Sequence, residues 1–279
     1  MISAPRAVTH VQALGYRGDH HLPVPESVAT EEPLEIRVAG PGQTPTPAVV
    51  TMRTPGHDFE LAAGFLVTEG LSAAHEVAAV AYCDGAEPEH RFNTVTVSLR
   101  RPWDPTATKR DFVVTSACGV CGKSSIDDVE LSCPVLAPGP AIAASLITLL
   151  PDRLRAGQRV FESTGGLHAA GLFDAEGELS CLREDVGRHN AVDKVVGNRV
   201  LTDRALAASG GALLMISGRV SFEIVQKAAM AGISVLAAVS APSSLAVTAA
   251  DRLGLTIAGF VRNGRYNVYT HPERIDLDR

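Results

Sequence analysis

Residues 212–260, ALLMISGRVSFEIVQKAAMAGISVLAAVSAPSSLAVTAADRLGLTIAGF, carry the pattern that decides the fold class. Three apolar runs have the length of buried strands: Ala212–Ser217, Ile233–Ser240 and Leu255–Phe260. Between them, Phe222–Ala231 and Ser243–Arg252 place apolar residues at helical spacing, and Gly232 ends the first of these helices. Because strands alternate with helices, this stretch predicts an α/β arrangement with some parallel pairing.

The residues on either side extend this pattern. Asn263-Gly264 lies between two strand-like runs, which is a strong signal for a two-residue hairpin. Upstream, we expect two more strands, joined by a hairpin loop at residues 174–177, and two more helices. The strands are His168–Phe173 and Leu179–Arg183, and the helices are Ala141–Leu150 and Asn190–Val196.

The N-terminal half is predicted to be rich in strands. The expected strands are Pro33–Ala39, Ala48–Arg53, Val77–Cys83, Phe92–Arg100 and Asp111–Ser116. A helix is expected over Asp58–Glu69, with Gly70 ending it. Residues 1–30 show no periodicity and indicate a loose arm with at most one short strand. The sequence therefore predicts a flexible arm (1–30), a β-rich part (31–135) and an α/β part (136–279).

Composition and charge exclude several classes of protein. The chain has 279 residues and a net charge of −6, which argues against non-specific binding to nucleic acid. It contains no apolar run of about 18 residues, so we expect no membrane span. The first 26 residues lack the apolar core of a secretory signal. The five cysteines are too few for a disulfide scaffold, so we expect reduced thiols and a cytoplasmic location.

A cysteine pair is the clearest chemical feature of the chain. Cys118 and Cys121 form a C-x-x-C motif in which Gly119 and Gly122 let the backbone turn sharply. The adjacent Lys123 favours the nucleophilic thiolate. From the residues alone, the pair fits half of a structural zinc site, a dithiol redox site, a sulfur carrier, or two ordinary buried thiols. The other cysteines are isolated, so none supplies the second pair that structural zinc sites usually have.

Residues 116–123, SACGVCGK, resemble the FdhD family of formate dehydrogenase accessory sulfurtransferases. Further motifs in the same order support the resemblance, which spans roughly residues 30–270. They are TPGHD at 54–58, GFL at 64–66, TEG at 68–70, TGGLH at 164–168, REDVGRHNAVDK at 183–194, SGR at 217–219 with Ser221 and Glu223, SAPSSLA at 240–246, and Gly259-Phe260 with Arg262.

The resemblance implies a sulfur carrier required for formate dehydrogenase activity. A cysteine desulfurase would supply sulfur, which the protein would carry as a cysteine persulfide to the molybdenum (or tungsten) bis(molybdopterin guanine dinucleotide) cofactor. This cofactor would be cargo that is then inserted into the formate dehydrogenase apoprotein, and no permanently bound metal is expected. The resemblance also implies a cytidine-deaminase-like C-terminal domain without deaminase chemistry, because Ala117 stands where the deaminase motif has proline before its first cysteine.

By resemblance, the persulfide role falls on Cys118 first and on Cys121 second. The segment that resembles the family's site for the guanine dinucleotide cofactor consists of Phe260, Val261, Arg262, Asn263, Gly264 and Arg265. Its two arginines and tight turn are suited to phosphates, although an ordinary solvated hairpin tip would show the same residues.

Two more groups of residues are candidates for the cofactor site. Ser217, Gly218 and Arg219 follow an apolar strand and precede a helix, where α/β proteins bind ligands. Ser243 or Ser244 occupies the equivalent place after the next strand, either as a helix cap alone or as a cap and ligand contact. His168 is kept as a further candidate for the cofactor pocket.

Three questions stay open at this level. Residues 183–194 would either position the pterin or phosphates, or form a hydrogen-bonded network that fixes the fold. Trp103 would be either a partner contact or a lid over local apolar surface. We expect an isologous homodimer, because two-fold dimers are the commonest oligomers. The resemblance leaves a non-catalytic cofactor chaperone and a dithiol oxidoreductase as alternative functions.

Overall fold

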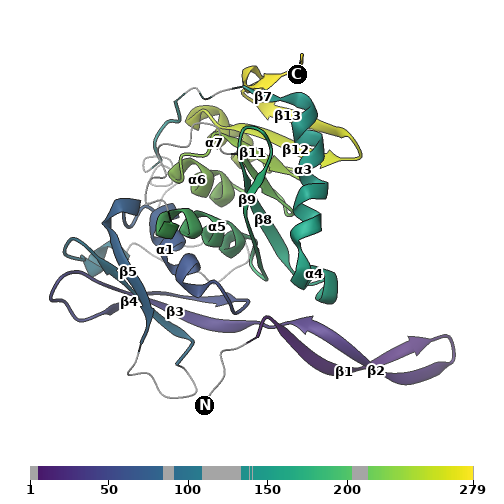
Figure 1. Ribbon diagram of the computed structural model, residues 1–279, viewed down its shortest axis with the longest axis horizontal. Helices are drawn as coiled ribbons and strands as arrows, with labels where there is room; N and C mark the ends of the chain where they lie inside the picture. The colour runs from purple at the N-terminus through teal and green to yellow at the C-terminus, as the bar shows by residue number, and fades with distance from the viewer. Residues whose placement is uncertain are drawn as a thin grey trace.

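The computed structural model describes residues 6–83, 91–108, 133–137, 139, 141–202 and 213–278. Figure 1 shows a C-terminal part built on one large sheet, an N-terminal sheet beside it, and a long hairpin that projects from the body. Within these residues, no helix is both long enough and apolar enough to cross a membrane. The mixed α/β class predicted from the sequence is confirmed, while the cytidine-deaminase likeness stays a prediction.

The C-terminal sheet has six strands in the order β13-β12-β11-β10-β8-β9. Their bounds are β8 His168–Phe173, β9 Leu179–Asp185, β10 Leu213–Ile216, β11 Val235–Ala238, β12 Thr256–Arg262 and β13 Arg265–Thr270. Strand β11 pairs in parallel with both β10 and β12, and the other pairs are antiparallel. The predicted parallel pairing is thus confirmed, as is the hairpin at Asn263-Gly264.

Helices cover both faces of this sheet. Their bounds are α3 Ala144–Gly157, α4 Arg159–Thr164, α5 Arg188–Thr202, α6 Phe222–Met230 and α7 Ser244–Leu253. Helix α3 packs with Phe173, Leu213 and Met215 on one face. Helices α5, α6 and α7 pack with Leu214 and Ile216 on the other face, which makes three layers.

Two helices differ from their predicted bounds. The predicted helix Ala141–Leu150 differs from α3 at both ends, because Ile142 and Ala143 form a short strand and α3 continues through Pro151 to Gly157. Ile147, Leu150 and Leu154 are all buried in the same core, and their packing outweighs the loss of the proline's N–H group. Helix α5 extends beyond the predicted Asn190–Val196 at both ends, and α4 is absent from the sequence-based prediction.

The N-terminal sheet has four strands in the order β4-β3-β6-β5. Their bounds are β3 Glu32–Ala39, β4 Thr46–Arg53, β5 Val77–Tyr82 and β6 Thr94–Leu99, and helix α1 covers Asp58–Thr68. The four strands and the helix are predicted in the right places, with ends that differ by at most two residues, and the expected strand Asp111–Ser116 lies outside the described residues. Trp103 is buried in the core of this part and donates from its indole Nε1 to Thr46, so it is a lid.

Residues 8–29 form a feature that the sequence analysis missed. Strands β1 (Val8–Arg17) and β2 (His20–Ala29) pair in antiparallel register along their full length. The prediction of a loose segment with one short strand is therefore wrong. Gly18 and Asp19 make the turn, with Gly18 at φ 61°, and this pair is a recognised hairpin signal. Apolar alternation is missing because both faces of the hairpin are largely exposed.

Small elements complete the described chain. They are the 3₁₀ turns Ala74–Glu76, Pro105–Thr108 and Pro272–Arg274, and the paired short strands β7 (Ile142–Ala143) and β14 (Ile275–Asp276).

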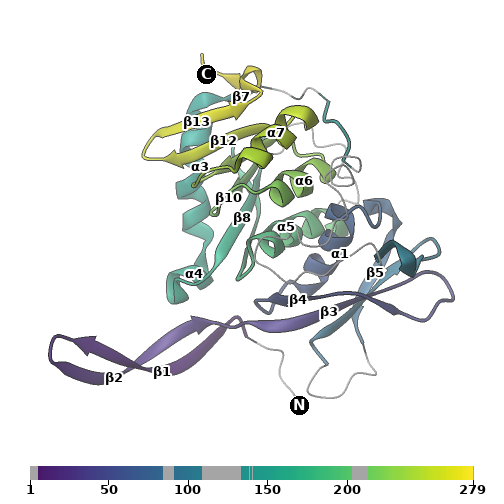
Figure 2. The same cartoon turned by 180° about the vertical axis from the view of Figure 1, so that it is seen from behind.

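One core joins the N-terminal and C-terminal parts. It contains Leu34 and Leu61 from the first part together with Val195 and Leu236 from the second. Helices α1 and α5 cross at the centre of this core and lie side by side in both views (Figures 1 and 2). The two parts therefore fold against each other rather than as separate bodies.

Two glycines permit the close crossing of α1 and α5. A Cβ atom on Gly197 would lie 1.7 Å from the Glu60 carbonyl oxygen, and one on Gly64 would lie 1.8 Å from the Asp193 carbonyl oxygen. Both neighbours are backbone atoms of a packed helix, so neither can move aside without shifting the helix. The crossing thus requires glycine at both positions.

We expect Gly197→Ala to lower the free energy of unfolding by about 2–3 kcal/mol, because overpacking forces the two helices apart. In an exposed helix the same change would stabilise the protein by up to about 1 kcal/mol. Chemical denaturation measures the difference. Gly166→Ala is the matched control, since its Cβ would meet nothing closer than 3.7 Å. A Gly197→Ala protein as stable as wild type would contradict the close crossing.

Candidate functional site

The candidate site lies along one edge of the six-stranded sheet, which we call the C-terminal edge. It is formed by the carboxyl ends of β10, β11 and β12, the start of β8 and the end of β9. The strand order brings three predicted groups to this edge: residues 260–265, residues 217–219 and His168. Neighbouring strands lie about 4.8 Å apart, so the edge from β12 to β8 spans roughly 14 Å. This length suits an extended ligand.

Ser217 and His168 are held together at the centre of the edge. The Ser217 hydroxyl accepts a hydrogen bond from the Ala169 backbone N–H at 2.9 Å, and the Ser217 N–H donates to the Ala169 carbonyl at 3.0 Å. A Cβ on Gly218 would lie 3.4 Å from His168 Nδ1, so the loop passes directly over the imidazole. Burial and the nearby Arg188 lower the pKa of His168, which favours its neutral form.

The segment Phe260–Arg265 forms the end of β12 and the following turn. Phe260 has φ 54°, a left-handed conformation that is costly for an aromatic residue, and its N–H donates to the Ser240 carbonyl at 3.1 Å. The Arg262 guanidinium lies 5.5 Å from the centre of the Phe260 ring. Arg262, Asn263, Gly264 and Arg265 are exposed, whereas the Val261 side chain is fully buried in the core beneath α3.

Ser243 acts as a helix cap. Its hydroxyl accepts a hydrogen bond from the Ala246 N–H at the start of α7. Its own N–H donates to the Val220 carbonyl at 2.9 Å, which ties the loop after β11 to the loop after β10. The capping role considered from the sequence is therefore confirmed, and the cap also holds two loops of the C-terminal edge together.

Three residues at this edge were not selected as site candidates from the sequence, namely His189, Ser221 and Glu223. His189, on the first turn of α5, lies 3.4 Å from the Ser221 hydroxyl and 3.8 Å from a Glu223 carboxylate oxygen at the start of α6. Burial lowers the pKa of His189 to about 3, and the positive charges of Lys227 and Arg188 add to the shift. The signal that selected residues 217–219, a helix start after a strand, also applies to Ser221 and Glu223.

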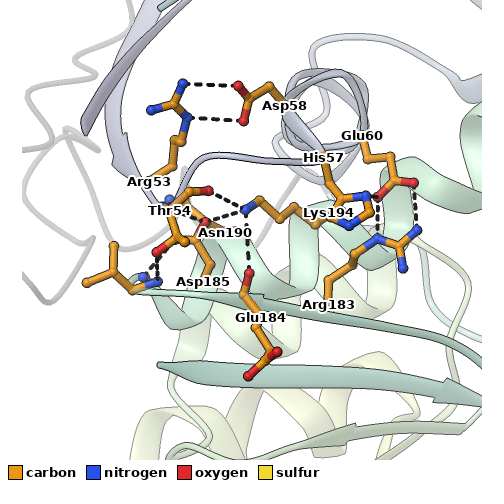
Figure 3. A network of polar contacts seen from close by, with 12 residues as sticks. Arg53, Thr54, His57, Asp58, Glu60, Arg183, Glu184, Asp185, Asn190 and Lys194 are labelled. Carbon is orange, nitrogen blue, oxygen red and sulfur yellow. Dashed lines mark hydrogen bonds and ion pairs between the residues drawn. The ribbon is translucent and has the colours of Figure 1, made fainter. Parts of the chain in front are cut away.

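The motif at residues 183–194 forms a buried network with residues 53–60, which Figure 3 shows from close by. Lys194 Nζ lies 2.7 Å from a carboxylate oxygen of Asp185 and donates to the Thr54 carbonyl at 2.8 Å. The same Asp185 carboxylate accepts from the Thr54 N–H and from the Asn190 amide. These contacts join the segment after β4 to β9 and α5, across 131 residues of sequence for Thr54 and Asp185.

Two arginine–carboxylate pairs flank this centre (Figure 3). Arg53 makes two hydrogen bonds of 3.0 Å to the Asp58 carboxylate and is fully buried. Arg183 makes a similar two-point contact with Glu60. Burial alone would raise the pKa of Glu60, but hydrogen bonds from Arg183, His57 and Asn198 outweigh it and lower the pKa to about 2.

A second buried cluster links α1, α5 and α6. Lys227 Nζ lies 2.9 Å from Asp193 and 2.7 Å from Glu69, and the Thr68 hydroxyl donates to Asp193 at 2.6 Å. Burial alone would lower the pKa of Lys227, but the two carboxylates outweigh it and raise the pKa, so the lysine stays charged. Most of the motif at residues 183–194 therefore belongs to a hydrogen-bonded network that fixes the fold, the second of the two roles considered from the sequence.

The remaining sequence candidates are thiols. Cys118 and Cys121 lie outside the described residues. Cys181 is buried, which raises the pKa of its thiol to about 11 and makes it a poor nucleophile. Cys83 directly follows β5, and its sulfur lies 3.1 Å from the Thr96 hydroxyl. Within the described ranges, no group of three or more His, Cys, Asp or Glu side chains has the arrangement of a metal site.

Comparisons with known proteins identify the family and the fold of this chain. The FdhD/NarQ family matches residues 29–276. The chain is 49% identical over 285 residues to the sulfur carrier protein FdhD of Mycobacterium tuberculosis, covering 98% of each chain. It is 51% identical to the protein of the same name from Streptomyces avermitilis, covering 91% of this chain and 90% of the other.

A solved structure has the same fold. The crystal structure of a protein described as a formate dehydrogenase accessory protein, from Desulfotalea psychrophila, matches with a TM-score of 0.74 and 26% identity. The match covers 97% of this chain and all of the other. Because the family match spans most of the chain and relatives near 50% identity span nearly all of it, this chain belongs to the FdhD/NarQ family.

Proposed function

We propose that this protein is a sulfur carrier that serves formate dehydrogenase and acts as a persulfide sulfurtransferase. The observation that carries the proposal is the sequence identity of 49–51%, over 91–98% of this chain, to proteins named sulfur carriers. The chain has the chemistry for this role, since Cys118 and Cys121 lie in a glycine-containing motif beside Lys123.

Loading needs no external oxidant. The Cys118 thiolate attacks the outer sulfur of a persulfide on a cysteine desulfurase. A new S–S bond forms on Cys118, the donor's S–S bond breaks, and the donor cysteine leaves as a thiolate. The number of sulfur–sulfur bonds is unchanged, so the exchange balances in atoms and electrons.

Release can use the second cysteine. When the Cys121 thiolate attacks the inner sulfur of the Cys118 persulfide, hydrosulfide leaves and a Cys118–Cys121 disulfide forms. The two cysteines supply the two electrons that convert the outer sulfur to sulfide. A cellular thiol reductant then restores the dithiol. This step assigns different roles to the two cysteines.

The acceptor in this proposal is a molybdenum bis(molybdopterin guanine dinucleotide) cofactor, bound as cargo at the C-terminal edge. Exposed Arg262 and Arg265 flank a tight turn, where guanidinium groups can bind phosphates at two points. His168, Ser217, Gly218 and Arg219 lie along the same edge. Phe260 and Asn263 hold the strained backbone of the turn, and Val261 anchors it in the core.

The partners follow from the chemistry. A cysteine desulfurase supplies sulfur, and the formate dehydrogenase apoprotein receives the sulfurated cofactor. The proposal includes a homodimer. It also includes a cytoplasmic location, since persulfide chemistry requires a compartment that keeps thiols reduced. Neither nucleic acid nor a membrane is part of the proposal.

The test is to incubate the protein with a cysteine desulfurase and cysteine, and to record intact masses and peptide maps. We expect an adduct of about 32 mass units on the peptide with the cysteine pair, removed by cyanide. The adduct should be absent from Cys118→Ala. It should persist in Cys121→Ala, which should no longer release hydrosulfide.

Cys83→Ala is the matched control, because this thiol directly follows β5 and should not affect loading. An adduct lost only in Cys121→Ala would reverse the two assigned roles. No adduct in any form, with guanine nucleotide still bound, would replace the carrier by a cofactor chaperone. A loss of about two mass units without sulfur uptake would indicate a dithiol oxidoreductase.

A further inference from the structure

The N-terminal hairpin, β1 and β2 at Val8–Ala29, projects from the body in both views (Figures 1 and 2). Strand β2 packs against α4, whereas the tip extends beyond the body. Two strands of ten residues at about 3.4 Å per residue make a ribbon roughly 34 Å long. Neither strand joins the sheets of the body.

This hairpin exposes more large apolar side chains than any other element described. It holds five of the thirteen such residues in the described ranges: Val11, Leu14, Tyr16, Leu22 and Val28. Leu14, Tyr16 and Leu22 are 58–69% exposed. The strand register places Leu22 and Val11 on one face and Leu14 and Tyr16 on the other, so both faces carry apolar surface.

A two-stranded hairpin alone is at best marginally stable in water, and several large apolar side chains exposed on one projecting element indicate an interaction site. The charge of the hairpin selects among partners. Its charged side chains are Arg17, Asp19 and Glu26, a sum of 1 − 2 = −1 with histidine neutral. It therefore lacks the charge that would attract nucleic acid or a strongly charged protein. The hairpin surface therefore suits an apolar contact with a permanently bound protein partner.

We propose that the N-terminal hairpin packs against a second copy of this chain and forms the dimer contact. One face of the ribbon measures roughly 34 Å by 10 Å, about 340 Å². In a two-fold dimer, two hairpins and the two surfaces they cover bury about four times this area, roughly 1,400 Å². Stable interfaces bury about 1,200–2,000 Å², so the two hairpins suffice.

The body offers a matching apolar surface on β4. Val50 and Met52 are two residues apart, so both point to the same face, and both are about half exposed. Strand β4 is also at the edge of its sheet. We assign this strand as the surface on which the partner's hairpin lies. This inference rests on the homodimer included in the proposed function.

The test is the molar mass of the protein in solution, by light scattering after size exclusion. Wild type should have the molar mass of two chains. The double variant Leu14→Asp/Leu22→Asp, which places one charge on each face of the hairpin, should have the molar mass of one chain. The dimer dissociation constant should rise at least about tenfold, and Met52→Asp should weaken the dimer in the same direction. Leu277→Asp, at a residue 83% exposed near the C-terminus, is the matched control and should stay dimeric.

A double variant that stays as dimeric as wild type would overturn the inference. Hydrogen exchange on wild type gives a second test that needs no variant, since hairpin amides should exchange more slowly as protein concentration rises. Exchange that does not depend on concentration would also overturn it. If wild type is a monomer, both the proposed homodimer and this inference are wrong. The sulfur-loading assay on the same sample would still test the carrier function.

Discussion

Lys194→Met is expected to lower the free energy of unfolding by about 3–5 kcal/mol, the usual effect of breaking a buried ion pair from one side. The Lys194 and Asp185 side chains are at most 1% exposed and their charged atoms lie 2.7 Å apart. Removing the ammonium leaves the Asp185 carboxylate buried without its cation. It also removes the hydrogen bond to the Thr54 carbonyl, which connects α5 to the segment after β4.

Chemical denaturation monitored by circular dichroism measures this change. Arg153→Met is the matched control, since its partner Glu178 is 76% exposed and this solvent-screened pair should contribute less than about 1 kcal/mol. Lys194→Met/Asp185→Leu should recover part of the loss, because both buried charges are then gone. A Lys194→Met protein within about 1 kcal/mol of wild type would refute the assigned role of the network.

Acid is expected to destabilise the protein through His189. Its folded pKa is lowered to about 3, chiefly by burial and also by Lys227, Arg188 and His168. Well above pH 6.5 the imidazole is neutral in both states. As pH falls through 6.5, the unfolded chain binds a proton that the folded protein does not, so stability falls until about pH 3. At about 1.4 kcal/mol per pKa unit, the full loss is at most roughly 5 kcal/mol, and the nearby Glu223 opposes it.

His189→Gln should remove this dependence, because glutamine does not titrate and can still hydrogen-bond to Ser221. We expect wild type to lose about 2 kcal/mol more than His189→Gln between about pH 7.5 and about pH 5. His57→Gln is the control, since His57 is half exposed. Denaturation curves at the two pH values decide the matter, and parallel losses in wild type and His189→Gln would show that His189 is not the group responsible.

Local sequence patterns predict where the residues of the candidate site lie along the chain, but not which residues contact each other. The strand-then-helix pattern placed residues 217–219 at the carboxyl end of a strand, and β10 confirms that position. The same pattern could not show that His168 lies beneath Gly218, because that contact depends on antiparallel pairing of β8 with β10. It also could not show which way residues 183–194 face, since their partners Thr54 and Glu60 are 131 and 123 residues away in the chain.

The two clearest errors have physical reasons. The predicted helix ends at Leu150, but burial of Leu154 one turn later keeps α3 intact through Pro151. The N-terminal hairpin shows no apolar alternation because both of its faces are largely exposed. In the first case tertiary packing outweighed the local signal, and in the second the lack of a buried face removed the apolar alternation that identifies a strand.

The sequence by itself determined the α/β class, the hairpin at Asn263-Gly264 and the family resemblance, because periodicity, turn chemistry and motif spacing act over a few residues. Only the tertiary structure decided that Gly64 and Gly197 let α1 and α5 touch, and that Lys194 contacts both Thr54, after β4, and Asp185, at the end of β9. Those contacts connect residues far apart in the chain. Their partners are fixed by the packing of whole elements, which no local pattern records.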